Sequence, residues 1–231
     1  MKIKVLFEDK EIIVCEKPVG LPSQGDKSFS LDMVSVIKNH IYENEGTTNP
    51  YVGVVHRLDR GVGGVMVYAK TKFAAGNLSL QVQQKEMQKK YLAVVTKTIE
   101  PMEETRWVSL EHYLVKDACT NLSKVVSKNT KDAKLAILEY QCKETKKIVE
   151  GDASLLEIKL RTGRHHQIRV QLSTVMEGIW GDTKYNKQFQ QTRGWKNIAL
   201  YSSSLTFVHP KTKKQMSFTE RPTAYPFCEF E

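Results

Sequence analysis

The stretch from 54 to 70 places the strongest constraint on how this chain can fold. It joins two apolar, β-branched runs through the charged turn His56-Arg57-Leu58-Asp59-Arg60 and three glycines. β-Branched runs favour buried strands, and a glycine-rich loop favours unusual backbone angles or close approach by another segment. The pattern predicts strands near 51–55 and 64–69, with Asp59 held between two arginines in the loop that joins them.

A second stretch carries three arginines, whose charge is opposite to that of Asp59: Arg161-Thr162-Gly163-Arg164-His165-His166-Gln167-Ile168-Arg169. It follows an alternating run at 154–160, which predicts a strand. Apolar residues at helical spacing then predict a helix over about 165–176. Arginines around a glycine turn at a helix N-terminus form an anion-binding arrangement, so this stretch favours phosphate as well as a carboxylate.

Asp59 is the one strong carboxylate candidate in the two stretches. Neighbouring arginines favour its ionised form, which can serve as a nucleophile, a base or an electrostatic stabiliser. A brace between an aspartate and the arginines of its own turn is the structural alternative. The histidines at 56, 165 and 166 can act in proton transfer or orient loops by hydrogen bonds, and both roles stay open at this point.

Composition and charge bound the remaining possibilities. A chain of 231 residues that is 40% hydrophobic predicts one compact domain over 1–231. Lysine and arginine number 35 against 26 aspartate and glutamate, so the net charge of 35 − 26 = +9 favours a polyanionic partner. No cysteine has zinc-ligand spacing, and no long apolar run opens the chain. We therefore expect a cytoplasmic protein with free thiols, no metal and no membrane association.

The rest of the chain alternates short strands with few helices. Helices are predicted over about 31–42, with Ser30 as the cap, and over 71–88. The region 96–150 predicts an antiparallel meander with an exposed charged tip at 143–147. Nucleotide-binding, metalloprotease and nucleophile-elbow motifs are absent, and glycosidase chemistry needs two carboxylates where these motifs offer one.

His56-Arg57-Leu58-Asp59, followed by a glycine turn and an apolar strand, resembles the catalytic motif of the RluA-type RNA pseudouridine synthases. Four further segments are similar to family motifs, in the same order along the chain: Glu16-Lys17-Pro18-Val19-Gly20-Leu21, Lys90-Tyr91-Leu92-Ala93-Val94-Val95, Thr162 to Arg169, and Gly181-Asp182. Val62-Gly63-Gly64 stands where many members have Thr-Ser-Gly. We expect no N-terminal S4-type RNA-binding domain.

The resemblance implies an α+β pseudouridine synthase fold: a long, mixed, mostly antiparallel sheet with flanking helices and a central active-site cleft. It implies cofactor-free conversion of a flipped-out uridine in RNA to pseudouridine. Asp59 is the implied catalytic carboxylate, Arg169 its ion-pair partner and Tyr91 the base-stacking residue. The implied substrate-binding residues are His56, Arg57, Arg164, His166 and Gln167.

The implied partner is an rRNA or tRNA stem-loop, bound by a monomer. Two other functions stay open from the sequence. One is a catalytically silent RNA-binding protein on the same fold, and the other is an unrelated basic enzyme acting on a nucleotide or sugar phosphate.

Overall fold

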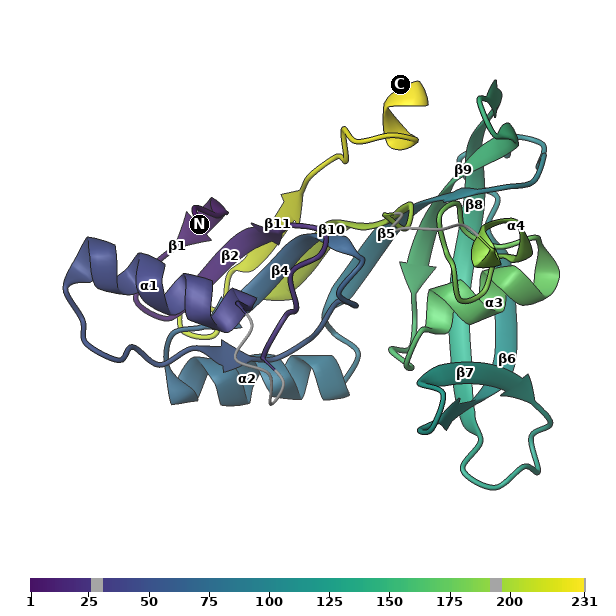
Figure 1. Cartoon of the computed structure of the whole chain (residues 1–231). Helices are drawn as coiled ribbons and strands as arrows, with labels where there is room; N and C mark the ends of the chain where they lie inside the picture. Colours follow the sequence, from purple (N-terminus) through teal and green to yellow (C-terminus); the bar gives the residue numbers. More distant parts are fainter. Residues whose placement is uncertain (26–30, 192–196, 231) are drawn as a thin grey trace. The chain divides into compact units, whose positions relative to one another are not determined.

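The computed structural model of the chain describes residues 1–25, 31–191 and 197–230 (Figure 1). The chain divides into two compact units. The first comprises Met1–Lys89 and Ser202–Arg221, and the second Lys90–Tyr201 and Pro222–Glu231. Each unit is described by itself, and the prediction of a single domain over 1–231 stays a prediction.

The first unit is built on a sheet in which the pairs β1–β2, β2–β4, β3–β4 and β10–β11 are antiparallel. Its strands follow the order β1-β2-β4-β10, with β11 paired to β10 and the short β3 paired to β4. Their bounds are β1 Lys4–Glu8, β2 Ile12–Lys17, β3 Gly53–Val54, β4 Gly63–Ala69, β10 Leu200–Val208 and β11 Gln215–Thr219. All seven residues of β4 are buried, as its near-continuous apolar sequence requires.

Two helices accompany this sheet. Helix α1 (Met33–Glu45) begins at Asp32, whose carboxylate accepts the N–H of Ser35, and ends at Gly46 in the left-handed conformation. Helix α2 (Lys72–Gln83) begins at Thr71, as the sequence predicts. Its buried side chains pack with alternate residues of β2 and β4 in one core cluster: Ile12, Val14, Val65, Val67, Ala69, Ala74 and Leu78.

The second unit holds another antiparallel arrangement, in the order β5-β9-β8-β6-β7. Its elements are β5 Gln88–Val95, β6 Val108–Asp117, β7 Leu122–Val126, β8 Lys134–Ile148, β9 Gly151–Leu160, α3 Gln167–Val175, α4 Lys187–Gln190 and the single-turn η1 Phe227–Glu229. A small core between α3 and the strands contains Leu114, Ala136 and Val170.

The predicted fold class is confirmed, and several local predictions are corrected. The middle region is antiparallel but is no simple meander, because β6 lies between β7 and β8. Leu114 of β6 pairs with Val125 on one side and with Lys134 on the other, so the loop 127–133 crosses from one side of β6 to the other. The charges at 143–147 lie within β8 rather than at a tip, since β8–β9 pairing continues to Ile148 and Gly151.

Helix limits also differ from the predictions. Ser30, the predicted cap, lies outside the described residues, and Asp32 caps α1 instead. Helix α3 begins at Gln167, two residues later than predicted, because His166 adopts a left-handed backbone (φ 52°) that a helix cannot include. Helix α2 ends at Gln83, five residues earlier than predicted.

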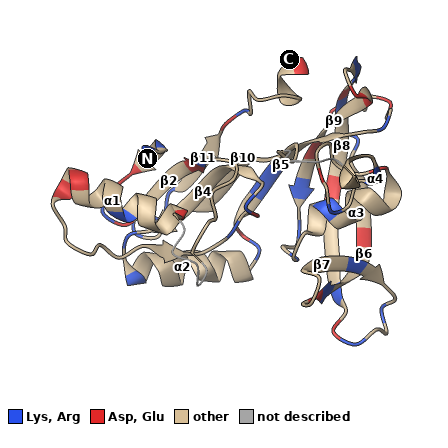
Figure 2. Ribbon diagram, viewed as in Figure 1, with Lys and Arg blue, Asp and Glu red and all other residues tan. Residues whose placement is uncertain are grey.

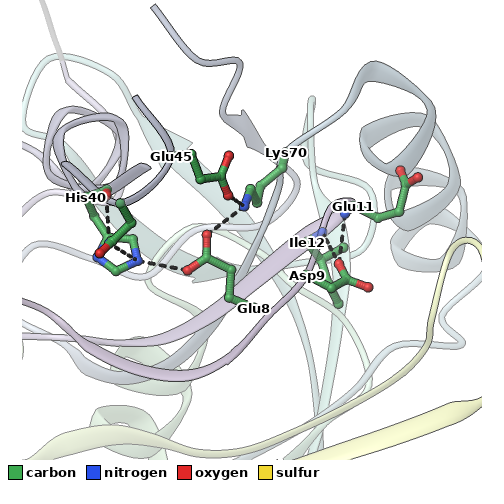
Figure 3. Close-up of polar contacts among 8 residues, drawn as sticks. Glu8, Asp9, Glu11, Ile12, His40, Glu45 and Lys70 are labelled. Atoms are coloured by element: carbon green, nitrogen blue, oxygen red, sulfur yellow. Dashed lines mark hydrogen bonds and ion pairs between the residues drawn. The ribbon is translucent and has the colours of Figure 1, made fainter. Parts of the chain in front are cut away.

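A group of charged side chains ties β1, α1 and the end of β4 together (Figure 3). The Lys70 ammonium lies 2.6 Å from carboxylate oxygens of both Glu8 and Glu45, and the other Glu8 oxygen lies 2.8 Å from His40 Nε2. The Lys70 side chain is only 7% exposed. Burial by itself would raise the pKa of Glu8, but its bonds to Lys70 and His40 outweigh burial and lower that pKa.

Lys70→Met should destabilise the first unit by about 1–2 kcal/mol, because it leaves Glu8 half-buried without its cation. Chemical denaturation at pH 7 measures this change. Lys72→Met, an exposed lysine outside the cluster, is the control and should change stability by less than about 0.5 kcal/mol. Since the pKa of Glu8 is lowered, the stabilisation is present above about pH 4.5 and lost as the pH falls further. Equal stability of the two variants would contradict this account.

Candidate active site

Asp59 lies on a loop that a second segment of the first unit holds in place. The Ser23 hydroxyl bonds both the carbonyl (2.8 Å) and the N–H (3.0 Å) of Leu58. Gly20 bonds Arg60 in both directions: its N–H donates to the Arg60 carbonyl at 2.8 Å, and its carbonyl accepts from Arg60 Nε at 2.9 Å. Segment 17–23, the Lys-Pro-x-Gly stretch, is therefore a clasp on both sides of Asp59.

The residues of this loop differ in their exposure to solvent. Leu58 is buried, Asp59 is half-buried, and both Arg57 and Arg60 are exposed. The Asp59 carbonyl accepts the N–H of Val62 at 2.9 Å, which closes a tight turn. The turn leaves the Asp59 side chain partly accessible while its backbone is fixed.

His56, predicted to bind substrate, is 7% exposed and braces the adjacent strand. Its Nε2 accepts the N–H of Val67 at 3.2 Å, so the neutral ring carries its proton on Nδ1. Among the described residues, that buried Nδ1 has no hydrogen-bond partner. Burial, and then the nearby Lys89, lower the pKa of His56 well below its usual range. His56 therefore stays neutral, and a role in substrate binding remains a prediction.

Gly64 is the position of Val62-Gly63-Gly64 that keeps the glycine of the usual Thr-Ser-Gly, so the departure is confined to Val62 and Gly63. Its φ is +122°, and a Cβ there would lie 2.3 Å from the carbonyl oxygen of Ser202 on β10. Only glycine permits both this backbone conformation and this close approach between strands. Ser202 Oγ donates to the Val65 carbonyl at 3.2 Å, which adds a side-chain bond between β10 and β4.

In the second unit, Arg169 makes a two-pronged ion pair with Asp182. Nε lies 2.8 Å from one carboxylate oxygen and a terminal nitrogen lies 2.7 Å from the other. The Asp182 side chain is fully buried, and its Oδ1 also accepts the N–H groups of Lys184 and Tyr185. The Arg169 guanidinium carbon lies 5.2 Å from the centre of the Tyr185 ring. Arg169 thus has a fixed orientation.

The rings of the two histidines before α3 stack on each other, and the Tyr185 ring packs edge-on against His166. The ring centres of His165 and His166 are 3.8 Å apart, and His166 Nδ1 lies 2.8 Å from the Tyr185 hydroxyl. Burial first, then Arg169, His165 and Lys184, lower the pKa of His166 to about 2. His166 is therefore uncharged at neutral pH and serves to fix Tyr185, whereas its predicted contact with substrate remains untested.

Gln167 holds the turn that carries Arg164. Its Oε1 accepts the Thr162 hydroxyl at 2.8 Å and the N–H of Arg164 at 2.9 Å, while Nε2 donates to the Ile137 carbonyl. Arg164 is exposed, with its Nε tied to the Leu135 carbonyl at 2.9 Å. The remaining guanidinium nitrogens of Arg164 are free of that bond and can reach a phosphate.

Tyr91 lies on β5 opposite Ile158 and is 5% exposed. The structure therefore groups Tyr91, Arg164, His166, Gln167 and Arg169 in the second unit, and His56, Arg57 and Asp59 in the first. The predicted ion pair between Asp59 and Arg169 joins residues of different units and stays a prediction.

Comparison with known proteins shows the family to which this chain belongs. Residues 11–174, more than half of the chain, match the family model for RNA pseudouridylate synthase. The chain belongs to this family. The matched span includes Asp59, Tyr91 and the 161–169 stretch, and it ends at residue 174, so it does not include Asp182.

Relatives in the RNA pseudouridylate synthase family match along almost the whole chain. A Helicobacter pylori protein named as an uncharacterized RNA pseudouridine synthase is 30% identical over 225 residues, covering 94% of this chain. This chain spans 66% of that relative's length. The tRNA pseudouridine synthase C of Haemophilus ducreyi is 29% identical over 236 residues, covering 95% of this chain and 90% of the relative.

The solved structure of human RNA Pseudouridylate Synthase Domain Containing 4 superposes with a TM-score of 0.72 at 22% identity. It covers 94% of this chain and 87% of the human chain. This likeness shows the fold and confirms the α+β pseudouridine synthase architecture that the motifs predicted. The central active-site cleft of that prediction stays a prediction, because each unit is described by itself.

Sequence reasoning did not single out three residues that bond to the predicted site residues or to their loops. Lys17, Asp182 and Tyr185 are held by buried or short polar contacts. The Gly181-Asp182 pair was visible as a motif, but its partner was not, because thirteen residues separate Asp182 from Arg169. Tyr185 lies in a polar stretch that reads as an ordinary surface loop.

In residues 1–25, 31–191 and 197–230, no three His, Cys, Asp or Glu side chains gather as metal ligands. In the same residues, no helix is long and apolar enough to cross a membrane. The predictions of no metal and of a cytoplasmic location remain predictions.

Gly64→Ala should destabilise the first unit by about 3 kcal/mol or more, because the new Cβ meets backbone atoms at a positive φ. Gly76→Ala is the matched control, since its Cβ meets nothing within 4 Å on helix α2. That control should raise stability by about 0.5–1 kcal/mol. Thermal and urea unfolding of the two variants measure the difference, and similar behaviour of both would refute the proposed close approach.

Asp182→Asn should destabilise the second unit by about 3 kcal/mol, because it keeps the shape but leaves the Arg169 charge without its buried carboxylate. Asp152→Asn, on an exposed residue of the same unit, should stay within about 0.5 kcal/mol. Urea unfolding followed by fluorescence measures both. The account fails if Asp182→Asn unfolds at the same urea concentration as Asp152→Asn.

Proposed function

We propose that this protein converts specific uridines in RNA to pseudouridine, with Asp59 as the catalytic carboxylate and without a cofactor. The observation that carries the proposal is the clasped loop: a half-buried aspartate whose backbone is fixed on both sides, next to exposed Arg57 and Arg60. A preorganised charge at a fixed position is what stabilisation of a charged transition state requires. Membership of the RNA pseudouridylate synthase family supports the same reaction.

The proposed reaction is an isomerisation, so no atoms are gained or lost overall. The bond between C1′ of the ribose and N1 of uracil breaks, the base turns while bound, and a bond forms between C1′ and C5. The proton at C5 leaves, and N1 takes up a proton. The ionised Asp59 attacks or stabilises the electron-poor centre that forms when the first bond breaks. Tyr91 stacks on the base and assists removal of the C5 proton.

Arg169 is proposed to form an ion pair with Asp59 and to hold its carboxylate in place. Its pairing with Asp182 and its place beside Tyr185 support this role, because they fix the direction of the guanidinium. An arginine held by a buried aspartate retains further donors for a second carboxylate. His56, His166 and Gln167 hold the two loops, and Arg57 and Arg164 are exposed cations suited to phosphate or the displaced base.

The uridine must leave its helix to reach Asp59, which costs a few kcal/mol. Phosphate contacts can offset that cost. One surface of the second unit suits this purpose, and we call it the basic hairpin. It carries five exposed lysines without a described ion pair: Lys116, Lys124, Lys128, Lys131 and Lys134.

The basic hairpin is bonded to the arginine stretch of the same unit. Its Ser123 hydroxyl bonds the His165 carbonyl at 2.7 Å, and the N–H of Ser123 donates to the Tyr185 hydroxyl at 2.7 Å. Lys184 Nζ donates to the Asn121 carbonyl at 3.2 Å. Figure 2 shows basic segments along β7 and the loop that follows it. These bonds fix the basic hairpin relative to the residues that flank Arg164.

Pseudouridine mapping tests the proposal directly. Purified protein is incubated with uridine-containing rRNA and tRNA transcripts, and pseudouridine is located chemically. We expect one or a few modified positions with the natural sequence and none with Asp59→Ala. Absence of modification in every transcript would favour the catalytically silent RNA-binding alternative. Full activity in Asp59→Ala would refute the role of Asp59.

The basic hairpin makes a separate prediction about salt. Lys128→Gln/Lys131→Gln should reduce the slope of log K against log salt by about 1–2, because each lost phosphate contact contributes about 0.7–0.9. Lys213→Gln/Lys214→Gln, in the first unit, changes net charge equally and is the control. Filter binding from 50 to 300 mM salt measures both slopes. Equal slopes for the two variants would show that net charge, rather than the hairpin, sets affinity.

A further inference from the structure

Ser123 of β7 is a buried polar residue in a strand where burial is unexpected. Among the described strands β7 pairs with β6 and ends the strand order of its unit, so one of its edges faces no strand. The backbone N–H groups of such an edge are exposed to solvent unless another segment covers them. Ser123 is nevertheless only 4% exposed, because the residues just before α3 and Tyr185 cover it.

The Ser123 hydroxyl contacts His165 in two places. Its oxygen lies 2.7 Å from the His165 carbonyl and 2.9 Å from His165 Nδ1. A hydroxyl has one proton to donate and a carbonyl can only accept, so this proton goes to the carbonyl. His165 Nδ1 must then donate to the Ser123 oxygen. The two bonds together fix both the backbone of His165 and the orientation of its ring.

The backbone of Ser123 makes a third bond, to a different residue. Its N–H donates to the Tyr185 hydroxyl at 2.7 Å, and the same hydroxyl lies 2.8 Å from His166 Nδ1. The ring of Tyr185 in turn lies against Arg169, with 5.2 Å between the ring centre and the guanidinium carbon. His166 is stacked on His165 at 3.8 Å between ring centres. Ser123 therefore bonds the two residues that hold His166, one of which contacts Arg169.

These bonds connect the basic hairpin to the guanidinium of Arg169. Lys124 directly follows Ser123 in β7, and phosphate contacts at the hairpin lysines would fix this strand against RNA. A displacement of β7 changes the bond lengths from Ser123 to His165 and Tyr185. Closely packed side chains transmit such a displacement instead of absorbing it, so the contact between Tyr185 and Arg169 changes as well.

We propose that Ser123 is a positioning residue, which couples RNA binding at the basic hairpin to the orientation of Arg169. This inference rests on the proposed function, in which the hairpin contacts phosphates and Arg169 takes part in the reaction. A role limited to stability is the alternative. In that case the loss of Ser123 would weaken the second unit, but the hairpin lysines and the chemical step would stay independent of each other.

Single-turnover pseudouridine formation at saturating RNA tests the coupling. Ser123→Ala removes both hydroxyl bonds and should lower the rate about tenfold, while the Kd for RNA stays within about twofold. Ser109→Ala, on an exposed serine of β6, is the matched control and should leave the rate unchanged. An unchanged rate in Ser123→Ala, or a loss of affinity alone, would overturn the proposal.

A double-mutant cycle separates coupling from a stability effect. Lys128→Gln/Lys131→Gln should lower the saturated rate about threefold in the natural background but less than about 1.5-fold in Ser123→Ala, where the hairpin no longer acts on Arg169. Lys213→Gln/Lys214→Gln, in the first unit, makes the same change in charge and should have equal effects in both backgrounds. Equal effects of the hairpin variant in both backgrounds would overturn the coupling.

Ser123→Ala can fail to fold, so a further measurement keeps Ser123 in place and needs no catalysis. Nitrogen-15 NMR of the histidine rings should show a proton on His165 Nδ1, and a ring with its proton on Nε2 alone would overturn the assigned bonds. A G–C RNA duplex without uridine serves as the RNA probe. Its binding should shift the Arg169 Nε–H signal, and this shift should be lost in Lys128→Gln/Lys131→Gln at saturating duplex.

The Lys213→Gln/Lys214→Gln protein is the control for the NMR titration and should keep the shift. Bound duplex without any change at Arg169 would overturn the proposal. If the natural protein modifies no RNA, the proposed function fails, but the histidine and arginine signals still decide whether the hairpin and Arg169 are coupled.

Discussion

The clasp between segment 17–23 and the loop around Asp59 is the interaction on which the rest of the proposed site depends. It joins residues about forty positions apart through Ser23 with Leu58, Gly20 with Arg60, and Lys17 with the Arg60 carbonyl. A loop with three glycines would otherwise have considerable conformational entropy. The clasp restricts the backbone on both sides of Asp59 and leaves its side chain half-buried, so a carboxylate can be held ready without being sealed from a substrate.

The second unit also fixes the position of a predicted site residue, but it does so through an ion pair. There a buried aspartate, Asp182, fixes the direction of Arg169, and the Tyr185 ring, whose hydroxyl bonds His166, lies against the guanidinium. His166 can take part because burial and neighbouring cations keep it neutral. Each unit therefore contains a fully buried ionisable side chain at this place: Lys17 in the first bonds the carbonyls of Pro18, Leu21 and Arg60, and Asp182 in the second pairs with Arg169. Removing the Asp182 charge leaves Arg169 without its buried partner, which explains the large stability effect expected there.

The elements that sequence predicts well are those with local causes. The buried strand at 63–69, the Thr71 cap of α2 and the order of motifs follow from neighbouring residues alone. The later start of α3 depends on the left-handed His166, and the placement of β6 between β7 and β8 depends on pairing across many residues. Neither leaves a local pattern.

The same distinction between local and distant causes applies to the residues of the candidate site. Asp59 and Arg169 were visible because each stands in a dense local motif. The partners of those motifs lie far from them in sequence: Lys17 bonds the Arg60 carbonyl across 43 positions, and Asp182 pairs with Arg169 across 13, so both contacts become apparent only when the chain is folded. The need for glycine at 64 likewise comes from Ser202, a residue of a distant strand.

The central claim is that Asp59 performs the chemistry while other residues supply the binding. Parallel measurement of RNA affinity and of single-turnover pseudouridine formation for Asp59→Asn tests it most directly. The account predicts a Kd within about twofold of the natural protein, together with a loss of at least about a thousandfold in the rate of the chemical step. Retention of the rate, or a loss of binding large enough to explain the loss of product, would contradict it.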